Sequence, residues 1–428
     1  MRRLVTFTLL SSALFSQQTP ETYYSVPSID APELAARGAL AVGVLTLTVT
    51  NPDQPDILQF DTATGKAPLT PRTLTLEIWY PATIPTGQRE HTTYQSILTP
   101  RGAPPIPYQT VGRALRDAPP KTGERYPLVI VSHGYPGSRT LLTWLTENLA
   151  SKGYVVAAID HTDSVSGAVR GFASTLLNRA SDQLFTIDKL AALSRQGGHP
   201  LNGILDSSRV AIVGYSMGGY GALAAGGAGY SKQGTSAKAV PGGYFDEWTA
   251  GSAKFDARPR NHIKALVAIA PWGAQPPMNN WDAAGLAGLR VPSLFIVGDH
   301  DDISGYEQGV KRAFDGAVHS NRCLLVFENA RHNVGGNPAP PEARMAFPTL
   351  ESFEEPVWRK ERITSINQHF ITAFLDLYLK GDETRRPYLT VAVPRSNDGK
   401  DAATLWKGFQ KRWALGLQLH CVPSAAQP

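Results

Sequence analysis

The residues best suited to chemistry lie in the segment 209–221, which has the sequence Arg-Val-Ala-Ile-Val-Gly-Tyr-Ser-Met-Gly-Gly-Tyr-Gly. It contains the pattern G-x-S-x-G, with Ser216 between Gly214 and Gly218. An apolar run precedes the pattern and small residues follow it, so the segment predicts a buried strand, a sharp turn and a helix. Such a turn, a nucleophile elbow, presents a serine hydroxyl for attack. An ordinary turn serine is the alternative interpretation.

An activated serine needs a general base, and the base needs an acid that orients it. In a parallel sheet both belong on loops after later strands. Asp299, Asp301 and Asp302 directly follow one apolar run, and His332 directly follows the next. His332 is therefore the candidate base, and the residues leave three carboxylates open as the acid. The other histidines that we considered lie in loops, before a strand or inside a predicted helix, and are weaker candidates: His91, His199, His319 and His369.

Two backbone N–H groups are needed to stabilise the oxyanion that forms on an attacked carbonyl group. Met217 follows the serine directly at the predicted helix start, and Tyr135 follows Gly134 in the loop after the apolar run 127–132. We expect the N–H groups of Met217 and Tyr135 to supply this oxyanion hole. The adjacent residues Asp299 to Asp302 lack a second group of matching ligands, so we expect neither a metal ion nor another cofactor.

Alternating strands and helices begin near residue 126, after two early strand-like runs that predict an antiparallel start of the sheet. Apolar runs buried on both faces and separated by helices predict a mostly parallel central sheet with helices on both faces, an α/β fold. The predicted strands are 41–50, 73–80, 127–132, 155–160, 210–213, 263–270, 293–297 and, as the last, 323–327; the predicted helices are 140–152, 181–194 and 362–380.

Several segments together resemble the α/β-hydrolase superfamily, and within it the dienelactone-hydrolase and platelet-activating-factor-acetylhydrolase-like serine esterases. The chain is also similar to secreted polyester hydrolases and cutinases, which share Ser-Met-Gly-Gly and Ala-Pro-Trp. The segments that carry the resemblance are Glu77-Ile-Trp-Tyr-Pro-Ala, Val131-Ser-His-Gly-Tyr-Pro-Gly-Ser, Leu149 to His161, Gly214 to Gly219, Ala270-Pro-Trp and the loops with Asp301 and His332.

The resemblance implies Ser216 as nucleophile, His332 as base and Asp301 as acid, because related enzymes place the acid three residues after a strand-ending glycine, here Gly298. It implies a secreted, cofactor-independent carboxylic ester hydrolase that works through an acyl-enzyme. A lipase or phospholipid acetylhydrolase, or a polyester hydrolase, is the alternative; a peptidase or amidase and a non-catalytic binding protein are further ones. Tyr215 departs from the histidine common in the group, and Tyr215 and Trp272 are candidate substrate contacts.

The 428-residue chain has a formal net charge of +5 with dispersed basic residues. Nucleic-acid binders concentrate such residues, so we expect a small-molecule, lipid or polymer ester as partner and no nucleic acid. Residues 1–18 resemble a signal peptide, and no other run is long enough to span a membrane, which predicts a secreted or periplasmic protein. Cys323 and Cys421 are the only cysteines; a disulfide and a buried free thiol at Cys323 are both open.

We expect one hydrolase domain over residues 23–385 and a C-terminal extension, 386–428, whose apolar residues pack back onto it. Two segments do not fit the alternation of strands and helices: Gly226 to Arg260 is rich in Gly and Ser, and Asn333 to Trp358 is rich in Pro. Loops of this length within a domain are usually functional or disordered. Since both leave the fold beside candidate catalytic residues, we expect them to be cap-like insertions that border the substrate cleft.

Overall fold

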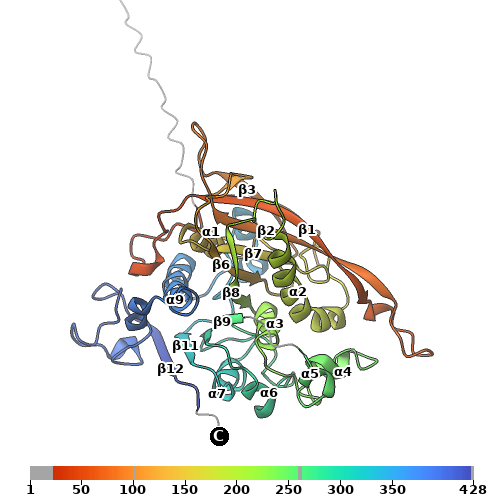
Figure 1. Cartoon of the computed structure of the whole chain (residues 1–428). Coiled ribbons are helices and arrows are strands. Elements are labelled where there is room, and N and C mark those ends of the chain that lie inside the picture. The colour runs from red at the N-terminus through yellow and green to blue at the C-terminus, as the bar shows by residue number, and fades with distance from the viewer. Residues whose placement is uncertain (1–22, 101, 259–262, 426–428) are drawn as a thin grey trace, which may run out of the picture.

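Six parallel strands form the centre of a ten-stranded sheet in the computed structural model, which describes residues 23–100, 102–258 and 263–425 (Figure 1). The expected signal peptide, 1–18, lies outside the described residues. The sheet order is β12-β11-β10-β9-β8-β6-β7-β2-β1-β5. The six parallel strands are β6 (Tyr126–Ser132), β7 (Val155–Asp160), β8 (Leu205–Tyr215), β9 (Ile263–Ile269), β10 (Ser293–Gly298) and β11 (Arg322–Phe327).

Antiparallel strands extend the parallel block at both ends. At one end β2 (Leu69–Pro81) pairs with β7 and with β1 (Val42–Pro55), and the two-residue β5 (Leu115–Arg116) pairs parallel with β1. At the other end β12 (Leu417–Val422) pairs antiparallel with β11. The expectation that residues 323–327 form the last strand is therefore wrong. β12 lies at the sheet edge and only its alternate residues are buried, so it lacks the continuous apolar run that marks the inner strands.

Cys323 of β11 and Cys421 of β12 are directly opposite each other in this antiparallel pair and form a disulfide. The C-terminal tail thus returns to the sheet and is covalently joined to it. Two aromatic residues of the tail, Trp406 and Phe409, are buried against Phe370 of helix α9 (Lys360–Lys380).

Helices cover both faces of the sheet, and alternate strand residues supply the two cores. In β6, Leu128 and Ile130 belong to the core that contains α2 (Phe172–Leu193) and α3 (Met217–Ala225), whereas Val129 and Val131 belong to the core that contains α1 (Thr143–Ser151) and α9. Helix α2 begins nine residues earlier than expected. Its first turns bury polar side chains such as Arg179, so the apolar periodicity that marks a helix is missing there.

A two-stranded hairpin, β3 (Thr92–Leu98) with β4 (Ile106–Gly112), stands apart from the main sheet and was not expected from the sequence. Leu98 and Tyr108 of this hairpin form a small core with Ala339 and Ala343 of the second insertion. The remaining helices are short: α4 (Thr235–Ala239), α5 (Ala253–Asp256), α6 (Ala283–Ala287), α7 (Arg312–Gly316), α8 (Phe347–Glu351), a π-helical turn at Tyr306–Lys311 and 3₁₀ turns at Glu33–Ala35, Ile57–Gln59, Asp246–Trp248, Pro341–Met345, Glu383–Tyr388 and Ser396–Asp398.

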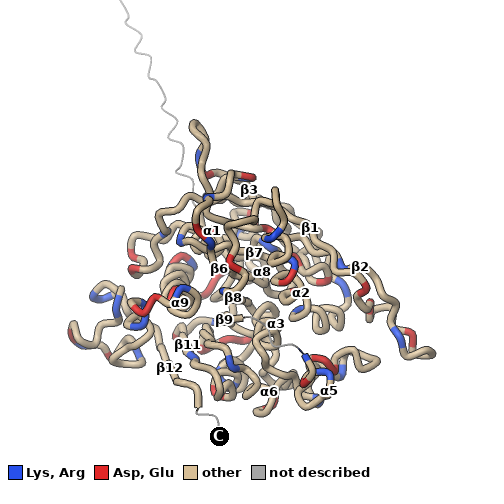
Figure 2. The backbone as a smooth tube through the Cα atoms, viewed as in Figure 1, with Lys and Arg blue, Asp and Glu red and all other residues tan. Residues whose placement is uncertain are grey.

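In the view of Figure 2, lysine and arginine are interspersed with aspartate and glutamate along the described backbone. Within residues 23–425, apart from the gaps given above, no helix has the length and apolar character needed to cross a membrane.

Candidate active site

Ser216 lies on a sharp turn between β8 and α3, with backbone angles of φ 53° and ψ −114°. L-residues rarely adopt a positive φ, so the turn is strained and is held by close packing on both sides. A Cβ atom on Gly214 would lie 2.2 Å from the carbonyl oxygen of Gly218, and one on Gly218 would lie 2.0 Å from the carbonyl oxygen of Ser132. Both glycines of the pattern are therefore required by close backbone contacts.

A chain of hydrogen bonds joins Ser216, His332 and Asp301. The Oγ atom of Ser216 is 3.0 Å from Nε2 of His332, and Nδ1 of His332 is 3.0 Å from each carboxylate oxygen of Asp301. Because a carboxylate only accepts, Nδ1 donates to it and Nε2 is left to accept the serine proton. Asp301 also accepts the backbone N–H groups of Ile303 and Ser304, at 2.9 and 2.7 Å, which fix the carboxylate in place.

The two neighbouring carboxylates point elsewhere. Asp299 accepts the backbone N–H of Asn329 at 2.6 Å and contacts the exposed imidazole of His300. Asp302 forms an ion pair with Arg331 near the surface. Of the three carboxylates that the sequence left open, the structure brings only Asp301 against His332.

The two candidate oxyanion donors come from two parts of the chain: Met217 directly follows Ser216, and Tyr135 belongs to the loop after β6. Met217 is the first residue of α3, and N–H groups in the first turn of a helix have no acceptor within it. In the other loop, a Cβ atom on Gly134 would lie 3.4 Å from Cβ of Ser216. The carbonyl oxygen of Gly134 is 2.7 Å from Nδ1 of His133, and since N–H and C=O of a trans peptide point in opposite directions, the N–H of Tyr135 points away from that ring.

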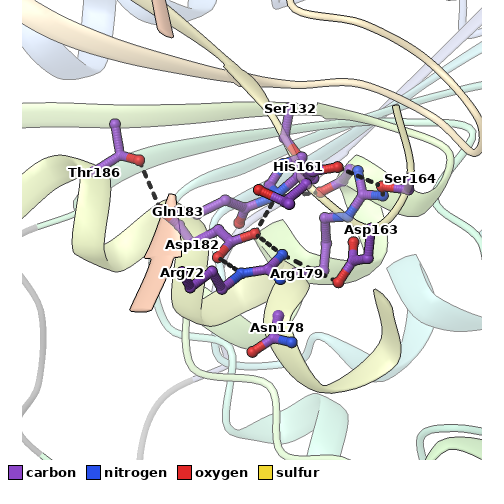
Figure 3. Close-up of polar contacts among 12 residues, drawn as sticks. Arg72, Ser132, His161, Asp163, Ser164, Asn178, Arg179, Asp182, Gln183 and Thr186 are labelled. Carbon is purple, nitrogen blue, oxygen red and sulfur yellow. Dashed lines mark hydrogen bonds and ion pairs between the residues drawn. The ribbon is translucent and has the colours of Figure 1, made fainter. Parts of the chain in front are cut away.

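A second Ser-His-Asp arrangement is formed by Ser132, His161 and Asp182 (Figure 3). Nε2 of His161 is 2.8 Å from Oγ of Ser132, and Nδ1 of His161 is 2.8 Å from the carboxylate of Asp182. All three side chains are buried, with at most 1% of their surface exposed. Burial lowers the pKa of His161 well below its usual value, so the imidazole stays neutral. No substrate can reach this serine, and the arrangement is structural.

Two buried arginines complete this network. Arg72 of β2 donates to Asp182 at 2.7 Å and to Asp163 at 3.1 Å; burial opposes its charge, but the two carboxylates outweigh burial and raise the pKa of Arg72. Arg179 donates to the carbonyl oxygen of His133 at 2.7 Å, directly before the loop that contacts Ser216, and burial lowers the pKa of Arg179 to about 10. The network therefore supports the backbone of the candidate oxyanion loop.

A cavity of about 830 Å³ opens beside Ser216. Three parts of the chain form its walls: the β3–β4 hairpin, the loop after β6 and the second insertion. Side chains that line it include Ile97, Leu98, Tyr108, Tyr135, Leu350 and Phe353.

The two candidate substrate contacts occupy different places. Tyr215 lines the cavity, its ring is stacked on His332 at 5.5 Å, and its hydroxyl donates to the carbonyl oxygen of His332 at 3.3 Å. Trp272 is not among the residues that line the cavity; it packs against Phe172 and Tyr220, with ring centroids 5.6 and 5.8 Å away. The structure thus places one of the two at the cavity.

The two insertions also differ. Asn333, Gly336, Asn337 and residues 347–356 of the second insertion form a large part of the cavity wall. The first insertion contributes no described residue to this cavity. Its aromatic residues pack instead in a buried cluster, in which Tyr230 stacks on Tyr220 and Phe245. Burying these large apolar side chains stabilises the segment more than exposure to the cleft would.

Comparison with solved structures identifies the fold. The described architecture aligns with a ferulic acid esterase from Streptomyces cinnamoneus over 82% of this chain and 94% of that chain, with a TM-score of 0.54 and 20% identity. The chain has the α/β-hydrolase fold. A family model described as PET hydrolase-like (PETase) matches residues 112–242 of this chain, which include the turn at Ser216.

Curated relatives of this chain include cutinases and an acetylhydrolase. Cutinase 2 of Thermobifida cellulosilytica is 28% identical over 50% of this chain, and a cutinase of Thermobifida fusca has the same identity over the same share. The match spans 63% and 51% of the length of these two cutinases. A platelet-activating factor acetylhydrolase of Cavia porcellus is 30% identical over 24% of this chain and 32% of its own length. The chain is thus similar to cutinases and to a platelet-activating factor acetylhydrolase.

Sequence reasoning missed several residues that hold this site together, among them His161, Arg179 and Glu355. A usable signal existed for one of them: Arg179 lies one turn before Asp182 and Gln183 on helix α2, and charged residues on a helix that must cover a sheet indicate a buried polar network. Among the described residues, no group of three or more His, Cys, Asp or Glu side chains is arranged to hold a metal ion.

Proposed function

We propose that this α/β-hydrolase is a carboxylic ester hydrolase that works through an acyl-enzyme on Ser216. The observation that carries the proposal is the continuous hydrogen-bond chain from Ser216 through His332 to Asp301, next to a cavity large enough for a small ester. Similarity to cutinases and to a platelet-activating factor acetylhydrolase supports it. If one of the three residues of this hydrogen-bond chain were missing, a non-catalytic binding protein would be favoured instead.

In the proposed reaction His332 Nε2 accepts the proton of the Ser216 hydroxyl while Oγ attacks the ester carbonyl carbon. The N–H groups of Met217 and Tyr135 stabilise the resulting oxyanion. His332 then donates the proton to the departing alcohol, which leaves an acyl group on Ser216. A water molecule, deprotonated by His332, attacks this acyl group; the bond to Oγ breaks, His332 returns the proton to Ser216, and the carboxylic acid is released. Asp301 holds the imidazole in the required tautomer and stabilises its charged form.

The cavity walls favour an ester with an apolar acyl or alcohol group. Its apolar lining includes Leu98, Tyr108, Leu350 and Phe353, and Ser216 and His332 lie at the same cavity. Ligand sites of this kind bind apolar groups by burial and use few polar groups for orientation. A polyester chain end is the second candidate substrate, which the PET hydrolase-like match and the cutinase relatives support.

We further propose that the protein acts outside the cytoplasm. The leader-like residues 1–18 and the Cys323–Cys421 disulfide support this location, since disulfides persist in oxidising compartments. Cell fractionation with mass spectrometry of the mature N-terminus tests it. Recovery of the intact leader in the cytoplasmic fraction would contradict the location.

Labelling with a fluorophosphonate, followed by turnover of chromogenic esters of increasing acyl length and their matched amides, tests the reaction. We expect label on Ser216, ester turnover well above amide turnover, and a loss of about 10⁴-fold or more in kcat for S216A and H332A. S132A is the matched control, since Ser132 has the same hydrogen-bond pattern but is buried. It should still be labelled on Ser216. Retained ester turnover in S216A would refute the proposal.

A further inference from the structure

The loop that carries His332 is held by a carboxylate from the second insertion. One carboxylate oxygen of Glu355 accepts the backbone N–H of Arg331 at 2.5 Å, and the other accepts the backbone N–H of Asn333 at 2.6 Å. These two residues flank His332 on either side. Glu355 is buried, with 6% of its surface exposed, so both hydrogen bonds are shielded from water and are made to a charged acceptor.

Other contacts from the same part of the chain hold the C-terminal side of this loop. The side-chain amide of Asn333 donates to the carbonyl oxygens of Glu351 and Glu354, at 2.7 and 3.1 Å, and the buried ammonium group of Lys360 donates to the carbonyl oxygen of Asn333. On the N-terminal side, Glu355 supplies the hydrogen bond to the backbone of Arg331. Removing Glu355 would therefore leave two shielded N–H groups without this acceptor and free the backbone on both sides of His332.

We propose that Glu355 is a positioning residue for His332, which ties the candidate base to the cavity wall. The inference rests on the proposed function, in which His332 Nε2 must face the Ser216 hydroxyl. The observed separation of Ser216 Oγ and His332 Nε2 is 3.0 Å, so a displacement of a few tenths of an ångström already weakens this hydrogen bond. Misplacing a reacting group by about 1 Å can cost on the order of 100-fold in rate.

The segment 347–355 has two roles in this arrangement. Its residues Phe347 to Phe353 form the cavity wall, and its end at Glu355 holds the loop of His332. The hairpin of β3 and β4 packs against this segment from the other side, through Leu98 and Tyr108. A displacement of the wall is thus transmitted to the backbone of His332 through a pair of hydrogen bonds.

The test compares E355Q and E355A with wild type in the full chain, using the rate of Ser216 acylation by a fluorophosphonate and the steady-state hydrolysis of a short chromogenic ester. Active-site titration gives the concentration of intact sites. Glutamine keeps one acceptor oxygen and places an NH₂ group against the second N–H, so E355Q should lose about 10-fold in kcat and E355A about 100-fold. KM should change less than kcat, because both carboxylate oxygens of Glu355 are bound to the backbone of the His332 loop.

Glu361, in the first turn of α9, provides the control. Its side chain is exposed, and it is not among the residues that line the cavity. E361Q should therefore keep kcat within about twofold of wild type. Melting temperatures of all variants separate a loss of fold from a loss of positioning; if E355A does not fold, E355Q decides.

Two outcomes overturn the inference. One is an E355Q variant with kcat and acylation rate within twofold of E361Q; the other is a loss of activity that disappears once the rate is divided by the number of titrated sites. Failure of the proposed function looks different: the wild-type chain would hydrolyse no ester, or S216A would keep its activity. If wild type is active, S216A is inactive and E355Q equals E361Q, only the role of Glu355 fails.

Discussion

Two serines of this chain lie 2.8 to 3.0 Å from a histidine that contacts an aspartate, and the surroundings of the two serines differ. The Ser216 arrangement opens on a cavity, so an ester carbonyl can reach its oxygen. The Ser132 arrangement is closed, and Arg179 beside it further disfavours a positive charge on His161. Identical hydrogen-bond patterns thus serve an expected catalytic role in one place and a structural role in the other.

Replacing Asp301 by Asn tests the acid at the scale of one side chain. Asparagine keeps the size of the side chain but can present its amide to His332, which favours the wrong imidazole tautomer and leaves Nε2 protonated. We expect kcat to fall by up to about 10⁴-fold for D301N, measured as ester turnover at neutral pH.

Asp299 and Asp302 are the matched controls, since they belong to the same loop and bind other groups. D299N and D302N should keep most of the turnover, and D299N should lower the melting temperature because Asp299 ties the backbone at Asn329. The assignment fails if D301N retains more turnover than either control.

Between elements, the buried ion pair of Arg72 with Asp182 joins β2 to α2, and its pair with Asp163 joins β2 to the loop after β7. R72M would leave Asp182 and Asp163 buried without their cation. Breaking such a pair by removing one partner typically costs about 3–5 kcal/mol, because an uncompensated charge stays buried. We expect a loss of this size in the free energy of unfolding, measured with urea.

Arg209 offers the comparison, because its pair with Asp206 is partly exposed to solvent and screened by it. R209M should change the unfolding free energy much less than R72M. Equal effects of the two variants would show that the Arg72 pairs are not what joins these elements.

The disulfide joins β12 to β11 across a sequence separation of 98 residues. Closing a loop of that length in the unfolded chain is worth roughly 4–5 kcal/mol by the chain-entropy estimate. C323S/C421S should therefore unfold at a lower denaturant concentration than wild type. A reducing agent should bring wild type to the same midpoint and leave the double variant unchanged; a midpoint equal to that of oxidised wild type would contradict the estimate.

For the molecule as a whole, three buried histidines make stability depend on pH. Burial lowers the pKa values of His133 and His161 well below the usual range, and burial together with Lys152 lowers that of His369 to about 3. In the unfolded chain each has a pKa of about 6.5. Below pH 6.5 the unfolded state therefore binds more protons than the folded state, so stability decreases as the pH falls.

His369 allows a direct measurement of this effect, since it lies far from the candidate site in helix α9. Between pH 6.5 and pH 4 it should account for roughly 3 kcal/mol of lost stability, at about 1.4 kcal/mol per pH unit for one proton. H369Q cannot take up that proton. The difference in unfolding free energy between wild type and H369Q should shrink as the pH falls over this window, and a constant difference would rule out the linkage.

Much of the fold could be predicted from the sequence because its signals are local. Continuous apolar runs indicated the inner strands, and G-x-S-x-G indicated the turn at Ser216, whose glycines are needed for contacts between adjacent backbone segments. The proximity of His332 to Ser216 could also be predicted, since parallel strands bring their carboxyl ends to the same edge of a sheet.

Only the tertiary structure decided which groups meet across long separations. The direction of each carboxylate in the loop after β10, the pairing of Cys323 with Cys421 and the two hydrogen bonds of Glu355 depend on the packing of segments that local sequence does not position. The same holds for the β3–β4 hairpin and for the inward packing of residues 226–258. Sequence patterns report which face of an element is apolar, whereas the partner of that face follows from packing of the whole chain.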